Sequence, residues 1–66
     1  MTLADNIWTR RVRAGLTQAQ AAERACWAQP RWSMLEAGHK DLRLTTLYKV
    51  ARVLNCTVEE LLRGES

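Results

Sequence analysis

Residues 16–38 constrain the fold more than any other part of this 66-residue chain. The stretch, LTQAQAAERACWAQPRWSMLEAG, predicts two short helices joined by a tight turn over residues 26–28. Thr17 and Gln20 have the spacing of a T-x-x-Q capping box, so the first helix is expected to start after Thr17. Pro30 is pre-set for the first helical position and restrains the residue before it, so we expect Gln29 to cap the second helix. The sequence therefore predicts one helix held at a steep angle on another.

The remaining sequence is also helical in pattern, with no alternation of the kind that strands show. Further helices are expected over residues 3–14, 44–54 and 58–63, with Thr2 and Thr57 as caps and Gly15 and Asn55 as stops. Five short helices with short connections predict an all-α, compact five-helix bundle and a single domain over residues 1–66. The apolar positions expected to face inward are Leu3, Ile7, Ala14, Trp32, Leu35, Leu44, Leu47, Val50, Ala51 and Leu54.

Positive charge is concentrated in the middle of the chain. Residues 10–43 hold seven Lys or Arg residues against three Asp or Glu residues, and residues 53–66 carry a net charge of −2. Charge alone fits either solubility or a polyanionic partner, and it favours nucleic acid only when combined with the helical pair. A chain this short can hardly enclose a catalytic pocket, and it shows no nucleophile–base pair, so an enzyme is not expected.

The two cysteines, Cys26 and Cys56, do not have a metal-ligand spacing, and His39 is the one histidine. Two buried reduced thiols are favoured over a disulfide, although sequence leaves both open. No signal peptide or transmembrane run is present, so we expect a cytoplasmic protein with no metal, no cofactor and no small-molecule ligand.

The order of several residues resembles a known family. The chain is similar over residues 3–63 to the helix-turn-helix domains of phage repressors, Cro proteins and xenobiotic-response-element-type (XRE-type) bacterial regulators. The resemblance implies a helix-turn-helix at about residues 17–37 and a recognition helix at about residues 30–37. The residues that carry it are Arg11, Leu16, Thr17, Gln18, Ala22, Trp32, Leu35, Glu36, Gly38, Leu44, Leu47, Ala51, Leu54, Val58, Leu61 and Leu62.

The resemblance also implies a partly buried ion pair between Arg11 and Glu36, which would fix the recognition helix on the first helix. This chain departs from the family pattern at several positions. Cys26 stands where many relatives have glycine, and a left-handed backbone there would cost about 1 kcal/mol. Small Ala21 and large Trp32 replace residues of intermediate size, which predicts compensation of core volume.

If the family function holds, two groups of residues would contact double-stranded DNA. Phosphate contacts are expected from Thr17, Gln18, Lys40 and Arg43. Base contacts are expected from the outward face of the recognition helix, namely Gln29, Pro30, Arg31, Ser33 and Met34. The alternatives are a surface capping glutamine at Gln18, a solvated charge at Arg31 and partial burial of Met34. Trp27 has three open interpretations: packing over the turn, a protein interface or the DNA backbone.

A single domain would read about four or five base pairs, so we expect a homodimer on a palindromic operator. The surface available for it is the C-terminal part, comprising Tyr48, Arg52, Cys56 and the Val58–Leu62 helix. The leading hypothesis is a transcriptional repressor or small autoregulatory control protein. The alternative is an antitoxin or adaptor that uses the same fold mainly to bind protein.

Overall fold

A computed structural model of the chain describes residues 2–38 and 43–63. The predicted all-α architecture is confirmed, because every element in these residues is a helix. The helices are α1 (Leu3–Arg13), α2 (Gln18–Arg24), α3 (Gln29–Glu36), α4 (Leu44–Val53) and α5 (Val58–Arg63). None of them is long and apolar enough to cross a membrane.

Three capping boxes define where helices begin. At α2 the Thr17 hydroxyl accepts the backbone N–H of Gln20 at 3.0 Å, and the Gln20 side chain accepts the backbone N–H of Thr17 at 2.9 Å. Thr57 and Glu60 make the same reciprocal pair before α5. Thr2 caps α1 with Asp5 as its partner. The expected starts of all three helices are thus confirmed, and local hydrogen bonding explains them.

The predicted cap of α3 is wrong. Ala28 takes the extended cap conformation (φ −69°, ψ 145°), and Gln29 is already helical. Pro30 therefore occupies the second helical position, where its missing N–H is also one that a helix leaves unpaired. The restraint that proline places on the preceding residue is a bias, and the turn overrides it at Gln29.

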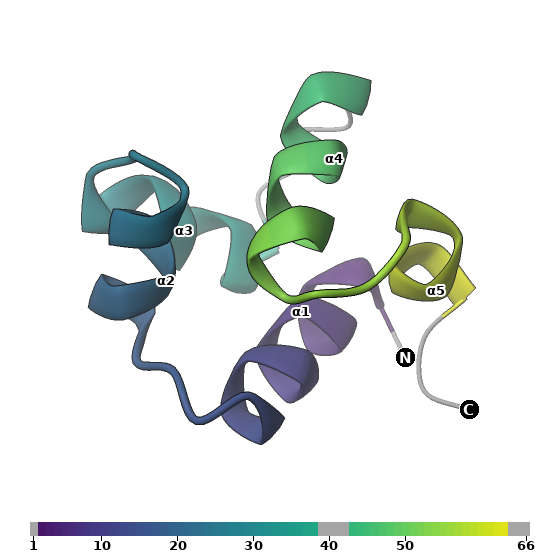
Figure 1. The fold of residues 1–66 in the computed structure, drawn as a ribbon, viewed down its shortest axis with the longest axis horizontal. Helices are drawn as coiled ribbons and strands as arrows, with labels where there is room; N and C mark the ends of the chain where they lie inside the picture. The colour runs from purple at the N-terminus through teal and green to yellow at the C-terminus, as the bar shows by residue number, and fades with distance from the viewer. Residues whose placement is uncertain (1, 39–42, 64–66) are drawn as a thin grey trace.

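The helices surround one core (Figure 1). Helices α2 and α3 lie at the left of this view and α5 at the right, with α4 above α1 in the middle. Trp32, Ala21 and Val50 are fully buried, and the rest of the core consists of Ile7, Leu16, Ala22, Ala25, Leu35, Leu47, Ala51, Leu54 and Leu61. The predicted inward positions are confirmed except Leu44, which is 57 % exposed, and Ala14, which is exposed just beyond the end of α1.

Two buried polar residues were not anticipated. Asn6 donates its side-chain N–H to the carbonyl of Leu61 at 3.0 Å, which ties α1 to α5. Thr46 is buried on α4 and accepts a hydrogen bond from Arg31 of α3 at 3.4 Å. Both positions link helices that are distant in sequence, so helical periodicity alone could not assign them to the core.

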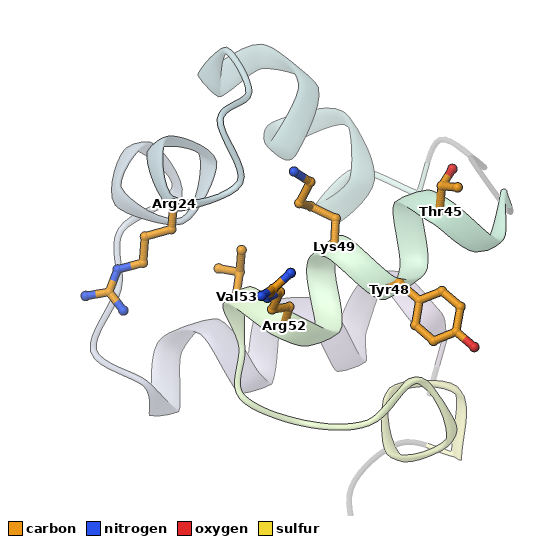
Figure 2. Close-up of a pocket in the computed structure, with 6 residues that line it drawn as sticks. All are labelled: Arg24, Thr45, Tyr48, Lys49, Arg52 and Val53. Atoms are coloured by element: carbon orange, nitrogen blue, oxygen red, sulfur yellow. The ribbon is translucent and has the colours of Figure 1, made fainter.

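Beside α4, the surface is hollowed. Figure 2 shows the hollow bordered by Arg24 at the end of α2 and by one face of α4. The α4 residues that line it are Thr45, Tyr48, Lys49, Arg52 and Val53.

The turn between α2 and α3 carries a strained backbone at Cys26. Its φ is +60°, in the left-handed region, and its side chain is exposed, so the expected burial of this thiol is wrong. Both Cys26 and Cys56 are free thiols. Within residues 2–38 and 43–63, the other positive φ outside glycine belongs to Asn55, a residue type that tolerates this conformation.

Replacing Cys26 with glycine should raise the free energy of unfolding by about 1 kcal/mol, because glycine adopts positive φ without steric cost. Chemical denaturation monitored by helical circular dichroism would measure the change. Cys26→Ala is the matched control, since alanine loses the thiol but keeps the Cβ, and it should give no such gain. Equal stability of the glycine and alanine variants would contradict the strain assigned to this turn.

Candidate nucleic-acid interface

Helix α3 turns one face inward and leaves the other to solvent. Trp32 and Leu35 are buried, with exposures of 0 % and 8 %. The residues predicted to contact bases lie on the other side, since Gln29, Pro30, Arg31 and Met34 are exposed and Ser33 is half-buried. Most of this face is therefore open to an external partner, although the guanidinium of Arg31 also contacts Trp27 and Thr46 of the same chain.

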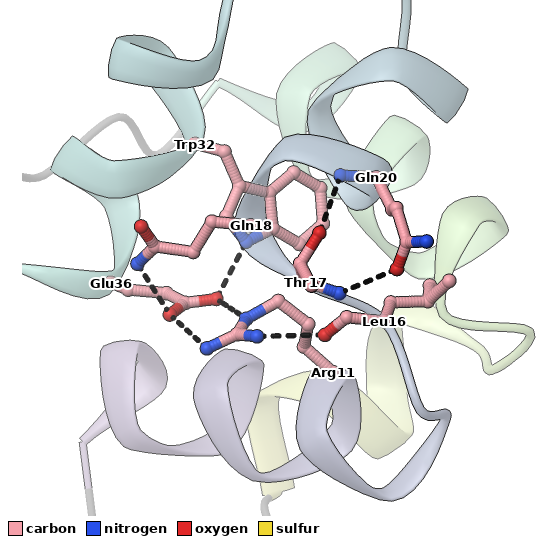
Figure 3. A network of polar contacts seen from close by, with 7 residues as sticks. All are labelled: Arg11, Leu16, Thr17, Gln18, Gln20, Trp32 and Glu36. Carbon is pink, nitrogen blue, oxygen red and sulfur yellow. Dashed lines mark hydrogen bonds and ion pairs between the residues drawn. The ribbon is translucent and has the colours of Figure 1, made fainter.

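Glu36, at the end of α3, accepts hydrogen bonds from three other side chains (Figure 3). Arg11 donates through Nε to Oε2 at 2.6 Å and through Nη2 to Oε1 at 3.1 Å. The indole Nε1 of Trp32 donates to Oε2 at 2.6 Å, and Gln18 donates through Nε2 to Oε1 at 3.0 Å. The ion pair expected between Arg11 and Glu36 is present, and it belongs to a larger network than the sequence predicted.

This network joins α1, α2 and α3 at one point. The side chains of Arg11 and Glu36 are only 11 % and 4 % exposed. Arg11 also donates through Nη1 to the carbonyl of Leu16 at 2.7 Å, just before α2 begins. The orientation of α3 is therefore fixed relative to both neighbouring helices by charge-assisted hydrogen bonds.

Burial of Glu36 raises the pKa of its carboxyl, but the hydrogen bonds from Arg11, Gln18 and Trp32 and the positive charge of Arg11 lower it more. The net result is a pKa below the ordinary value of 4.5. The folded chain therefore favours the ionised carboxylate at this position.

Thr17 and Gln18, at the start of α2, are two of the residues predicted to contact phosphate, and their surroundings differ. Thr17 is exposed, but its hydroxyl is engaged in the capping box. Gln18 is half-buried, and one of the two N–H groups of its amide is directed at Glu36. The N-terminal turn of α2, with the N–H groups that a helix leaves unpaired there, lies beside the end of α3.

Arg31 is held in place by two neighbours. Its guanidinium carbon lies 4.1 Å from the centre of the Trp27 ring, a cation–π contact, and Nη2 donates to Thr46 of α4 at 3.4 Å. Trp27 in turn packs against Trp32, with ring centres 6.1 Å apart. Packing over the turn is thus the observed position of Trp27.

Arg43 is exposed and stands at the cap position of α4. Lys40 and His39 lie outside the described residues. Among the described residues no group of His, Cys, Asp or Glu could hold a metal ion.

Sequence reasoning found Arg11 and Glu36 but missed Gln18 and Trp32 as their partners. It also missed Trp27 as the support of Arg31. A signal existed for Trp32, because it lies four residues before Glu36 and thus on the same side of one helix. The contacts of Gln18 and Trp27 depend on how separate helices meet.

Comparison with known proteins supports the same fold. The sequence model of the family described as Helix-turn-helix matches residues 9–61. A hypothetical transcription factor, NHTF, from Neisseria has a similar structure, with a TM-score of 0.88 and 25 % identity over 96 % of this chain and 72 % of that chain. The clp gene regulator ClgR from C. glutamicum gives a TM-score of 0.83 and 25 % identity over 91 % of this chain and 78 % of its own. No curated protein sequence matches.

Replacing Glu36 with glutamine should lower the free energy of unfolding by on the order of 3 kcal/mol, because Arg11 would be left as an uncompensated, mostly buried charge. Thermal or urea unfolding would measure the loss. Glu23→Gln, a change of an exposed carboxylate on α2, is the matched control and should stay within about 0.5 kcal/mol of the parent.

A double-mutant cycle tests whether Arg11 and Glu36 are coupled. The free energy of unfolding lost in the double variant Arg11→Met/Glu36→Met should be smaller than the sum of the losses in the two single variants. Additive losses would mean that the pair is not coupled.

Stability should also depend on pH through Glu36. A carboxyl whose pKa is lower in the folded state contributes stability that is fully present above its unfolded pKa. That contribution is lost as the pH falls from about the ordinary value of 4.5 through the lower folded pKa. Unfolding midpoints measured from pH 7 to pH 3 should therefore fall more steeply for the parent than for Glu36→Gln. The hydrogen bonds between Glu60 and Thr57 also lower the pKa of the Glu60 carboxyl. Glu60 therefore accounts for part of the pH dependence that remains in Glu36→Gln. Parallel curves would contradict the role of Glu36.

Proposed function

The chain belongs to the helix-turn-helix family of phage-repressor and XRE type, and on that premise we propose that it is a sequence-specific regulator of transcription that inserts α3 into the major groove of double-stranded DNA. Family membership indicates a DNA-binding regulator and not an enzyme. The single observation that carries the proposal is that α3 exposes its polar face while Glu36 anchors its other side.

Base reading would come from two polar side chains with different preferences. The amide of Gln29 suits adenine, and the guanidinium of Arg31 suits the two acceptors of guanine. Because Trp27 and Thr46 already hold Arg31, its guanidinium loses less conformational freedom on binding than a mobile one would. Pro30 and Met34 offer apolar contact to thymine methyl groups, and Ser33 is a small polar neighbour of both.

Phosphate contacts would flank α3 on either side. At the start of α2, the backbone N–H groups near Thr17 and the second amide N–H of Gln18 would bind one strand. Arg43 and Lys40 would bind the backbone on the other side of the groove. One N–H of the Gln18 amide donates to Glu36, so the contact with Glu36 would hold the amide whose second N–H binds the phosphate.

We further propose that the chain acts as a repressor or a small autoregulatory control protein, bound to the nucleoid in the cytoplasm. A homodimer on a palindromic operator would double the number of base pairs read. Tyr48 and Arg52 are exposed and Cys56 is half-buried, which supports the C-terminal helices, including Val58–Leu62, as the contact between protomers. Burial raises the pKa of the Cys56 thiol above its ordinary value of 9.0.

A second candidate is an antitoxin or adaptor that binds mainly protein. Two large apolar side chains on α1 favour it, because Trp8 and Val12 are 51 % and 47 % exposed and lie one turn apart. This pair is on a different helix from the face of α3 proposed for DNA. The two candidates therefore place their partners on different surfaces.

Binding to DNA should weaken steeply with salt, by about 0.9 in the log–log slope for each phosphate contact. The variant Gln18→Ala/Arg31→Ala/Arg43→Ala should abolish the salt-sensitive binding, and Arg31→Ala alone should cost about 1–3 kcal/mol at one base pair. Selection of sites from random DNA, followed by fluorescence anisotropy across a salt series, would measure both effects and reveal half-site spacing.

Arg63→Ala is the control for charge, since it removes an exposed cation of α5 that pairs with Glu59 at 3.1 Å and lies away from α3, and it should leave the selected sequence unchanged. An adaptor would instead give weak binding that hardly varies with salt and no enriched sequence. Full binding by the triple variant would remove α3 and its flanks from the DNA interface.

A further inference from the structure

Trp27 lies in the turn before α3, and the end of α2 fixes its backbone. Its N–H donates to the carbonyl of Ala22 at 2.9 Å, and the N–H of Cys26 donates to the carbonyl of Glu23 at 3.0 Å. These two bonds form a Schellman motif, which depends on the left-handed backbone that Cys26 adopts at φ +60°. The end of α2 therefore determines where the Trp27 side chain leaves the backbone.

A second contact fixes the ring of Trp27. This residue precedes Ala28, which caps α3 without a side-chain hydrogen bond, and Trp32 is the fourth residue of that helix. Contact between these two positions is a hydrophobic staple, and the two rings have centres 6.1 Å apart and planes inclined at 46°. Trp32 is fully buried and donates to Glu36 at 2.6 Å (Figure 3), so it gives Trp27 a firmly held surface to pack on.

The guanidinium of Arg31 lies over the ring that these contacts hold. Its Cζ is 4.1 Å from the centre of the Trp27 ring, and Nη2 donates at 3.4 Å to the hydroxyl of Thr46, which is buried on α4. A planar guanidinium with one contact on an aromatic ring and another through an N–H group has few orientations left to it. Arg31 is still exposed to solvent, so the two contacts orient its guanidinium without burying it.

We propose that Trp27 is a positioning residue that sets the orientation of the Arg31 guanidinium and so determines how strictly Arg31 discriminates one base pair. This inference rests on the proposed function, in which Arg31 reads guanine. Bidentate binding to guanine requires two N–H groups to meet two acceptors at once, which a guanidinium held in one orientation does more selectively than a mobile one. A mobile guanidinium can turn to a phosphate or to another base edge instead, which keeps affinity and lowers discrimination.

Replacing the Trp27 ring tests this role. Trp27→Leu keeps an apolar side chain against Trp32 but removes the aromatic face beside Arg31, whereas Trp27→Phe keeps an aromatic face. The base pair in question is the one at which Arg31→Ala loses discrimination, measured by fluorescence anisotropy on selected sites with single substitutions. There, Trp27→Leu should lower discrimination by about three- to tenfold, and Trp27→Phe should recover most of it. Discrimination at the other base pairs should stay as in the parent.

Two further measurements separate positioning from a general loss of structure. Combined with Arg31→Ala, Trp27→Leu should cause no additional loss at that base pair. Without DNA, nitrogen-15 relaxation of the Arg31 Nε–H group should show an ordered side chain in the parent and a mobile one in Trp27→Leu. Trp8→Leu is the matched control, since it removes a half-exposed tryptophan of α1 and should change neither result. Circular dichroism would verify that each variant is folded.

Unchanged discrimination in Trp27→Leu, or an Arg31 side chain that stays ordered in that variant, would overturn the inference. An equal loss at every base pair would also overturn it, because Trp27 would then only stabilise the turn. If Arg31→Ala selects the same sequence as the parent, Arg31 reads no base, and the inference fails while the proposed function stands. A parent chain that enriches no sequence would contradict the proposed function itself, so the two failures can be told apart.

Discussion

The carboxylate of Glu36 is the constraint on which the arrangement of α1, α2 and α3 depends. Moving an ion into a protein interior is costly, and it is tolerated here because Arg11, Gln18 and Trp32 all donate to it. A buried ion pair contributes little net stability compared with apolar packing, but it is demanding in geometry. Its main effect is therefore to favour one orientation of α3 over the alternatives that a small apolar core would permit.

Trp32 connects this polar network to the apolar core. Its ring is fully buried and its indole N–H donates to Glu36 at 2.6 Å, so one side chain fills volume and satisfies charge. Ala21 is also fully buried, on the helix that packs against α3. A small residue on one helix and a large one on its neighbour thus belong to one core cluster.

The sequence was sufficient for those parts of the fold that local physics determines. Capping boxes at Thr2, Thr17 and Thr57 rely on bonds between residues three apart, and Asn55 adopts the backbone that ends α4. The polar network and the support of Arg31 by Trp27 could not be predicted in this way, because they join residues on different elements. The hollow was missed for the same reason, since Arg24 reaches it from α2 and the other cations from α4.

Because the chain is small, the two sides of α3 have different roles. The inward side of α3 is occupied by Trp32, Leu35 and Glu36, which leaves only its outward side for a ligand. Binding there would place a phosphate near Gln18, and Gln18 shares its amide with Glu36. A shift of α2 that moved Gln18 would therefore also disturb the carboxylate that orients α3. If α3 binds DNA as proposed, phosphate contact and base reading would therefore depend on the same hydrogen-bonded centre around Glu36.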